Sequence, residues 1–408
     1  MRRRDFLAFS AAGLVSPFTA RAAEKDAPGP GAMRRRLAEH RLEKIEVFHI
    51  SESFGRFVGR NARHGPTGRG SSYQVRRLTT DRGATGWAMS YGPGEKLQKY
   101  IGSRLSDLID PVDGTRRELH PLQMALYDLA GSVLDMPVYG MLGGQGTREP
   151  LVYSGAIYFE DLEDRHEKSG VDAVLAACRQ DYEAGYRAFK LKMGRGHRWM
   201  DRAEGLKRDI DVTRAVREEF PDCRVLVDAN DGWPVEDAVE FVEQTADCDM
   251  FWIEEPFREN REDLLTLHEA MERVGCEAYI ADGEARSDQA DEPWRYGGYT
   301  HEFIERLYSL ADEDLVDVFL LDLGIVGFSN WRRIMPELQE AGVQAAPHTW
   351  AWAPRTYYAA HLAAGAGNVL IVEGIPARSE QIDYGDWRIE GGRLHVPEIP
   401  GWGLKLNA

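Results

Sequence analysis

Short apolar runs that end in charged residues recur through the middle of the chain, and the segments between them have apolar positions at helical spacing. The clearest of these runs cover residues 186–192, 224–228, 250–256 and 278–284. Buried strands that alternate with amphipathic helices predict a parallel sheet with crossover connections. In a barrel of parallel strands, polar residues at the carboxyl ends gather at one mouth, where such barrels carry their chemistry.

The same pattern predicts further strands at residues 151–154, 315–322, 343–347 and 369–372. Together with the first four runs they make eight, the number that closes a parallel barrel. We therefore predict an α/β fold with a TIM-like (β/α) barrel over residues 151–380. An insertion rich in Trp, Tyr and Gly, residues 287–300, is expected after the fifth strand on the mouth side.

An α+β domain over residues 24–150 is predicted to precede the barrel, and residues 381–408 are predicted to return and pack on it. Alternating apolar positions predict antiparallel strands at residues 45–50, 73–79 and 86–89. Apolar positions at helical spacing predict two helices, at residues 95–108 and 121–131. The Gly- and Arg-rich segment 51–72 is predicted as a loop. It is either a lid that turns its arginines toward an anion or a solvated loop; these arginines are Arg56, Arg60, Arg63 and Arg69.

The first 23 residues have the pattern of a twin-arginine signal peptide, with Arg3 and Arg4 before a short apolar run and a small-residue cleavage signal at residues 20–22. The apolar run is too short for a permanent membrane span. We therefore expect a periplasmic protein that contacts the membrane only during export, and we exclude the leader from the fold.

Composition narrows the class of protein. The chain has 408 residues, 43% of them hydrophobic and 29% charged, which suits a large folded core. Its net charge of -17 argues against nucleic-acid binding. The four cysteines have no C-x-x-C spacing, so we expect buried free thiols; a disulfide between Cys223 and Cys248 stays open as the alternative.

Lys190 and Lys192 are separated by one residue on a predicted strand, so both point to the same face. If that face is the barrel interior, each ammonium group lowers the pKa of the other. A lysine that is partly neutral at pH 7 can remove a proton, and its charged neighbour can bind a carboxylate. The alternative is a pair of lysines that extend into solvent from an edge strand.

Three acids, Asp228, Glu254 and Glu284, end three consecutive predicted strands. Because neighbouring strands lie about 4.8 Å apart, their carboxylates can share one ion. Oxygen ligands of this kind favour Mg²⁺, with Mn²⁺ also possible. The alternative role is N-capping of the helices that follow.

Asp322 and His348 end the next two predicted strands, on the wall opposite Lys192. An acid beside a histidine fixes its tautomer and stabilises its charged form, which makes a competent acid or base. Glu373, at the eighth strand, is expected near the substrate carboxylate and could donate a hydrogen bond if protonated. Asn230, two residues after Asp228, is expected to bind substrate as well.

These residues suit one type of reaction, the removal of the α-proton of a carboxylate. That proton is very weakly acidic, and its removal builds a dianionic enediolate. A metal and a lysine at the two carboxylate oxygens stabilise this charge as it develops. Lys192 and His348 are then the candidate bases, acting from opposite faces.

As a set these motifs resemble the enolase superfamily, specifically its mandelate racemase subgroup. The features that match the family are the K-x-K pair, the three acids, the Asp–His dyad and the late glutamate. Residues 80–87 also resemble the family's capping-domain hairpin, and residues 125–144 resemble its domain-closing helix. The resemblance implies an N-terminal capping domain completed by the C-terminal tail. It also implies Mg²⁺, a small carboxylate substrate and a homo-oligomer.

The resemblance further implies dehydration of an acid sugar (an aldonate or aldarate) to a 2-keto-3-deoxy acid. A racemase or epimerase of a 2-hydroxy acid would need the same residues, so this alternative stays open. An alternative of another class is a non-catalytic periplasmic receptor for sugar acids. The presence of both candidate bases and all three acids argues against the receptor.

Overall fold

The computed structural model describes residues 28–407 except 91, 93, 165–167 and 285–297. The predicted leader lies outside the described residues, as does most of the predicted insertion at 287–300. Among the helices that are described, none combines the length and the apolar character that crossing a bilayer requires.

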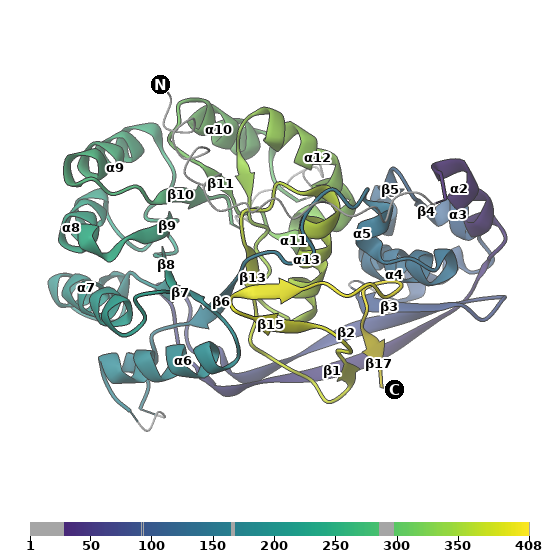
Figure 1. The fold of residues 1–408 in the computed structure, drawn as a ribbon, viewed down its shortest axis with the longest axis horizontal. Coiled ribbons are helices and arrows are strands. Elements are labelled where there is room, and N and C mark those ends of the chain that lie inside the picture. Colours follow the sequence, from purple (N-terminus) through teal and green to yellow (C-terminus); the bar gives the residue numbers. More distant parts are fainter. Residues whose placement is uncertain (1–27, 91, 93, 165–167, 285–297, 408) are drawn as a thin grey trace.

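The N-terminal domain is built on an antiparallel sheet of three strands, β1 (Leu42–Val58), β2 (Gly68–Thr80) and β3 (Thr85–Met89). The first two strands form a long hairpin that runs along the lower edge of the molecule (Figure 1). The predicted loop at 51–72 is therefore wrong for most of its length, because the strands extend to Val58 and resume at Gly68. Arg and Gly in this stretch hid a strand whose alternate side chains are buried.

Apart from one long helix, the other described elements of this domain are short. Helix α4 (Gln123–Leu134) is almost entirely buried and packs on β3, in agreement with the helical spacing in the sequence. The helix predicted at 95–108 is wrong, since the chain there forms two single 3-10 turns and a short α3. The remaining elements are α2 (Pro30–Ala38), η2 (Gly94–Lys96), η3 (Gln98–Tyr100), α3 (Leu105–Leu108), β4 (Ile109–Asp110), β5 (Gly114–Thr115), η4 (Arg117–Leu122) and α5 (Val138–Met141).

The second domain contains an eight-stranded parallel sheet in the order β12-β11-β10-β9-β8-β7-β6-β13. A bridge between Ala345 in β12 and Val369, three residues before β13, joins the two ends of the sheet and closes the barrel. The strands are β6 (Val152–Ile157), β7 (Ala188–Lys192), β8 (Arg224–Asp228), β9 (Met250–Glu254), β10 (Tyr279–Asp282), β11 (Val318–Phe319), β12 (Gln344–Ala345) and β13 (Val372–Gly374). All eight predicted strands exist, although β13 begins where the predicted eighth strand ended.

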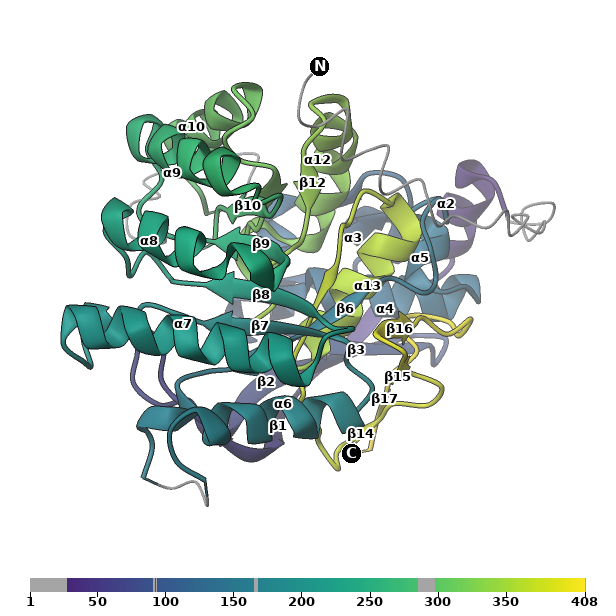
Figure 2. The ribbon, with the colours of Figure 1, turned by 60° about the vertical axis from the view of Figure 1, so that its left-hand side comes forward.

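Helices cover the outside of the barrel, and Figure 2 shows α7, α8 and α9 stacked beside strands β7, β8 and β9. The helices are α6 (Val171–Glu183), α7 (Arg202–Glu219), α8 (Val235–Thr245), α9 (Arg261–Val274), α10 (His301–Asp312), α11 (Leu323–Val326), α12 (Phe328–Glu340) and α13 (Pro354–Ala366). Short 3-10 turns η5 (Glu160–Leu162), η6 (Arg195–His197) and η7 (Ala246–Cys248) interrupt the connections. All four cysteines are buried free thiols, as expected.

The alternation of side chains along β7 decides which residues face the barrel interior. Ala188 belongs to the cluster that fills the barrel interior with Leu226 and Trp252, whereas Phe189 and Leu191 pack into the larger core with the helices. Because side chains alternate along a strand, Lys190 and Lys192 share the interior face with Ala188. The condition on which their predicted role depends is therefore met.

The C-terminal segment packs between the two domains. It forms β14 (Ile382–Asp383), β15 (Arg388–Glu390), β16 (Arg393–His395) and β17 (Lys405–Leu406). The backbone N–H and indole N–H of Trp402 donate to Asp128 Oδ1 (2.8 Å) and to Met124 O (2.8 Å), both in helix α4. On its other side the Trp402 ring lies against Tyr358 and His361 of helix α13. One aromatic side chain thus links the N-terminal domain to the barrel.

Candidate active site

The predicted site residues meet at one mouth of the barrel because the strands end in register. Lys192, Asp228 and Glu254 are the last residues of β7, β8 and β9, and they lie directly beside one another in the sheet. Glu284 follows the end of β10 by two residues, and Asp322 and His348 form an isolated parallel bridge beyond β11 and β12.

The three predicted metal ligands form a compact cluster. Asp228, Glu254 and Glu284 each offer an oxygen, and these oxygens all lie within 4.8 Å of one another. Within the described part of the chain, Glu254 Oε2, Glu284 Oε2 and Asn230 Oδ1 are buried and have no hydrogen-bond partner. Buried oxygens that lack donors are costly unless a cation binds them. The donor set therefore fits a divalent ion that prefers oxygen ligands.

The alternative role, capping of the following helices, belongs to other residues. Asn260 and Thr300 cap α9 and α10 through their side chains, and α8 begins after Pro234 without a side-chain cap. Asp228 Oδ1 instead accepts a hydrogen bond from Asn230 N (2.9 Å) in the tight turn after β8.

The two lysines act as counter-ions of these acids. Lys190 Nζ lies 2.8 Å from Glu254 Oε1, 3.1 Å from Glu373 Oε1 and 3.4 Å from Asp228 Oδ2. Lys192 Nζ donates to Asp228 Oδ2. Through these contacts the two buried ammonium groups join acids from β8, β9 and β13 at the barrel mouth.

Lys190 lowers the pKa of Lys192, as expected, but the pKa values of both lysines are raised overall in this structure. Burial and Lys190 lower the pKa of Lys192, but Asp228, Tyr158 and Glu284 together outweigh them and raise the pKa above its ordinary value. Glu254 and Glu373 likewise hold the pKa of Lys190 well above its ordinary value against the effect of burial. A lysine paired with a carboxylate is a proton donor, so base chemistry requires that the acids have another cation as partner.

The opposite wall holds the dyad. Strands β7 and β11 are four places apart in the eight-stranded ring, so Asp322, three residues after β11, faces Lys192 across the mouth. His348 Nδ1 lies 2.8 Å from Asp322 Oδ2, and His348 Nε2 lies 3.1 Å from Glu284 Oε1. Burial lowers the pKa of His348, but Glu284, Glu373 and Asp322 outweigh it and raise the pKa to about 9. His348 is therefore charged at neutral pH in this structure.

Glu373 lies beneath the histidine and is ionised. Its Oε2 accepts hydrogen bonds from Thr349 N (2.5 Å) and Trp350 N (2.9 Å). Burial raises the pKa of Glu373, but Lys190 and His348 outweigh it and lower the pKa to about 2. The expectation that a protonated Glu373 donates to the substrate is therefore wrong, because an ionised carboxylate only accepts.

Three of the four arginines singled out in the β1–β2 hairpin already bind partners within the protein. Arg56 is buried in an ion pair with Asp181 of helix α6 (2.5 Å). Arg60 pairs with Glu163 (2.7 Å). Arg63 donates to Asn230 O (2.6 Å), which fixes the hairpin end against the turn after β8. The hairpin is thus attached to the barrel beside the mouth by cations that already have partners.

Sequence reasoning missed two site residues, Tyr158 and Arg355. Tyr158 directly follows β6, and its ring centroid lies 5.3 Å from Lys192 Nζ; a longer first strand in the prediction would have placed it at the mouth. Arg355 Nη1 lies 3.0 Å from Asp322 Oδ2. Nothing in the local sequence marks Arg355, because its partner is brought to it only by the fold.

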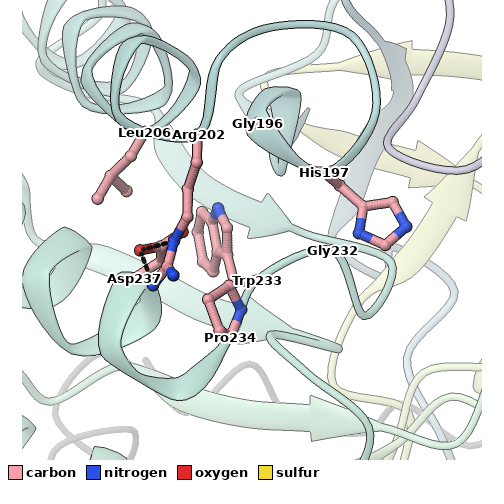
Figure 3. Close-up of a pocket in the computed structure, with 8 residues that line it drawn as sticks. All are labelled: Gly196, His197, Arg202, Leu206, Gly232, Trp233, Pro234 and Asp237. Carbon is pink, nitrogen blue, oxygen red and sulfur yellow. Dashed lines mark hydrogen bonds and ion pairs between the residues drawn. The ribbon is translucent and has the colours of Figure 1, made fainter.

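A separate hollow of about 190 Å³ lies on the outside of the barrel between η6 and the start of α8 (Figure 3). Its polar side is formed by the ion pair between Arg202 and Asp237 (2.8 Å), drawn with dashed lines in Figure 3. None of the predicted site residues lines this hollow, so we do not assign the chemistry to it.

Comparison with known proteins agrees with this architecture. The family model described as "Enolase C-terminal domain-like" matches residues 173–291 and 299–408. A mutant galacturonate dehydratase from Geobacillus sp., solved with Mg, is 30% identical with a TM-score of 0.82, and the alignment covers 91% of this chain and 94% of that one. D-galactarolactone cycloisomerase of Agrobacterium fabrum is 27% identical over 78% of each chain. D-xylonate dehydratase of Haloferax volcanii is 26% identical over 70% of this chain and 66% of its own length.

The fold and the site define a barrel enzyme with a carboxylate cluster and two cationic side chains at its mouth. The chain belongs to the enolase superfamily and to its mandelate racemase subgroup. It is accordingly an enzyme, a lyase or an isomerase. The resemblance inferred from the motifs is confirmed.

Proposed function

We propose that this enzyme removes the α-proton of an acid sugar and expels the β-hydroxyl, giving a 2-keto-3-deoxy acid through an enediolate. The observation that carries the proposal is the carboxylate cluster between Lys192 on one wall and His348 on the other, with buried oxygens that have no partner within the described part of the chain. A divalent ion bound by Asp228, Glu254 and Glu284 supplies the charge that stabilises the enediolate. We propose Mg²⁺ for this ion, with Mn²⁺ as the alternative.

The residues of the chain divide the remaining work. Lys190, whose ammonium group is buried between two walls, binds the substrate carboxylate. Asn230 Oδ1, which has no partner among the described residues, accepts a hydrogen bond from a substrate hydroxyl. Glu373 holds Lys190 in place and accepts hydrogen bonds from backbone N–H groups in the turn after His348.

Proton transfers balance across the two walls. Lys192, as the neutral amine once it is released from Asp228, takes the α-proton, and the electron pair of the C–H bond enters the enediolate. His348 gives its proton to the β-hydroxyl, the C–O bond breaks with its electron pair on oxygen, and water leaves. The resulting enol loses its hydroxyl proton, takes up a proton at the β-carbon and becomes the 2-keto acid.

Racemisation or epimerisation is the second candidate because both cationic residues flank the same cluster. Removal of the α-proton by Lys192, followed by delivery of the proton of His348 to the opposite face, inverts the carbon. Relatives of this chain include dipeptide epimerases, for example the hydrophobic dipeptide epimerase of Enterococcus faecalis, 28% identical over 38% of this chain. The named dehydratases among the relatives favour dehydration.

A screen of aldonates, aldarates and uronates with Mg²⁺, in D₂O, tests the proposal. We expect a 2-keto product from at least one compound. Exchange of the α-proton without a 2-keto product would replace dehydration by racemisation or epimerisation. Neither product nor exchange from any member of these classes would reject the proposal.

We also propose three properties that concern the whole protein. The N-terminal 23 residues direct export to the periplasm by the twin-arginine route, which cell fractionation of the wild type and of an Arg3→Lys/Arg4→Lys variant tests. The domains span residues 24–150 and 151–380, with 381–408 completing the first. The enzyme is a homo-oligomer, which light scattering tests.

A further inference from the structure

The carboxylate of Asp322 contacts more donors than a histidine partner requires. Its Oδ1 accepts hydrogen bonds from Gly324 N (2.7 Å) and Ile325 N (3.0 Å) at the start of α11. Its Oδ2 is shared by His348 Nδ1 (2.8 Å) and by Arg355 Nη1 (3.0 Å). The dyad is therefore a chain of three side chains in which a guanidinium lies behind the carboxylate.

We propose that Arg355 is a positioning residue of the Asp322–His348 dyad, acting through Asp322 and never touching substrate. By binding Oδ2 it holds the carboxylate in the rotamer that accepts the hydrogen bond from Nδ1–H of His348. An ionised carboxylate only accepts, so Nδ1 carries the proton and Nε2 is left for the substrate side. This inference rests on the proposed function, in which His348 exchanges a proton at Nε2.

Arg355 is itself fixed in place from several directions. Its Nη1 also donates to Trp350 O (3.2 Å), and its guanidinium lies 5.0 Å from the centre of the Trp352 ring. A Cβ at Gly324 would lie 2.2 Å from Arg355 Nη2, so the glycine leaves the space that the guanidinium occupies. Only 7% of Arg355 is exposed. A planar group held in this way can orient its partner.

The permanent charge of arginine gives this arrangement a purpose during turnover. His348 alternates between charged and neutral forms if it transfers a proton, so its attraction for Asp322 changes within each cycle. The guanidinium stays charged throughout. Burial raises the pKa of Asp322, but Arg355 and then His348 outweigh it and lower the pKa to about 2. Asp322 thus remains an acceptor when His348 is neutral.

The test separates positioning from a purely structural ion pair. Histidine-labelled protein is examined by ¹⁵N and ¹H NMR for the Nδ1–H resonance of His348, which is assigned by its absence in His348→Asn. Arg355→Met removes the guanidinium and keeps much of its volume, and Arg355→Lys keeps the charge. Arg56→Met is the matched control, because it breaks another buried arginine–aspartate pair, with Asp181 at 2.5 Å.

We expect Arg355→Met to lose or broaden the Nδ1–H resonance, Arg355→Lys to recover part of it, and Arg56→Met to keep it. With the substrate found in the acid-sugar screen, kcat of Arg355→Met should fall about 10–100-fold, the range typical of residues that orient a functional side chain, while KM changes little. An unchanged resonance in Arg355→Met, or equal losses in Arg355→Met and Arg56→Met, would overturn the proposal.

The two readouts distinguish this proposal from the proposed function. If no acid sugar is turned over, the proposed function fails, yet the resonance still reports whether Arg355 orients His348. If the wild type turns over a substrate and Arg355→Met keeps both its resonance and its kcat, only the role of Arg355 is rejected.

Discussion

The two walls of the barrel mouth differ in how their acids are partnered. On the cluster wall, lysines pair with Asp228 and Glu254 and His348 contacts Glu284, yet buried oxygens of Glu254 and Glu284 have no partner among the described residues. On the dyad wall, Asp322 accepts from four donors. One wall leaves oxygens available to a ligand, and the other uses its own donors.

This difference assigns the work of each wall. Acids with unpartnered buried oxygens destabilise the protein unless a cation binds them, so the cluster wall fits a metal site. Acids that are saturated with donors stabilise a fixed geometry and bind nothing further. The pKa values follow the same division, since burial and Asp228 raise the pKa of Glu254 well above its ordinary value, whereas the pKa of Asp322 is lowered to about 2.

Removing the divalent metal should reduce turnover more than any other change, because the carboxylates of the cluster wall would lose the ion that they are proposed to bind. In the proposed mechanism a divalent ion would contribute several kcal/mol to the stabilisation of the enediolate, so we expect turnover to fall on the order of 10⁴-fold without it. The measurement is product formation after treatment with EDTA and again after Mg²⁺ is restored. Full activity in the presence of EDTA would mean that the cluster wall needs no ion.

Lys192→Ala should have the next largest effect, through the loss of one proton acceptor. We expect α-proton exchange to fall about 10²–10⁴-fold while Mg²⁺ still binds. Exchange of the α-proton in D₂O is followed by NMR. Lys207→Ala, which removes an exposed lysine paired only with Asp211, is the control and should keep the wild-type rate. Exchange at that rate in Lys192→Ala would remove Lys192 from the mechanism.

The contacts of Asp322 on the dyad wall should make the free energy of unfolding depend on pH. The folded pKa of Asp322 is about 2 and its ordinary value is 3.8, so its stabilisation is present above pH 3.8 and is lost as the pH falls toward 2. The total is about 2 kcal/mol, of which about 1 kcal/mol is lost by pH 3.

Urea unfolding at pH 5 and pH 3 measures this effect. The difference in unfolding free energy between wild type and Asp322→Asn should shrink by about 1 kcal/mol at the lower pH. Asp211→Asn, at an exposed acid of helix α7, serves as the control and should show no such change. A difference of the same size at both pH values would contradict the saturated dyad.

The sequence predicted the cluster wall better than the dyad wall, and the reason is local. Lys192, Asp228 and Glu254 each follow an apolar run directly, so the strand pattern marks both the strand and its functional end. The role of Arg355 depends on Asp322, 33 residues away in sequence. The charge states also depend on contacts across the barrel, which is why the pKa directions of the lysines and of Glu373 were predicted wrongly.

The hairpin shows the same limit for the fold. Residues 51–72 have the composition of a loop, yet β1 and β2 extend through most of this segment. Side chains of the segment form ion pairs with residues of the barrel domain. Arg56 is buried only because Asp181 of helix α6 meets it. Partners supplied by a distant element leave no periodic signal in the local sequence.

Calorimetric titration of Mg²⁺ into the wild type and Glu254→Gln tests the central claim most directly. Glu160→Gln, a change at a fully buried acid outside the cluster, is the control. We predict one ion per chain in the wild type and in the control, and an affinity at least about 10-fold weaker in Glu254→Gln. Equal affinity in all three proteins would contradict a metal site formed by Asp228, Glu254 and Glu284.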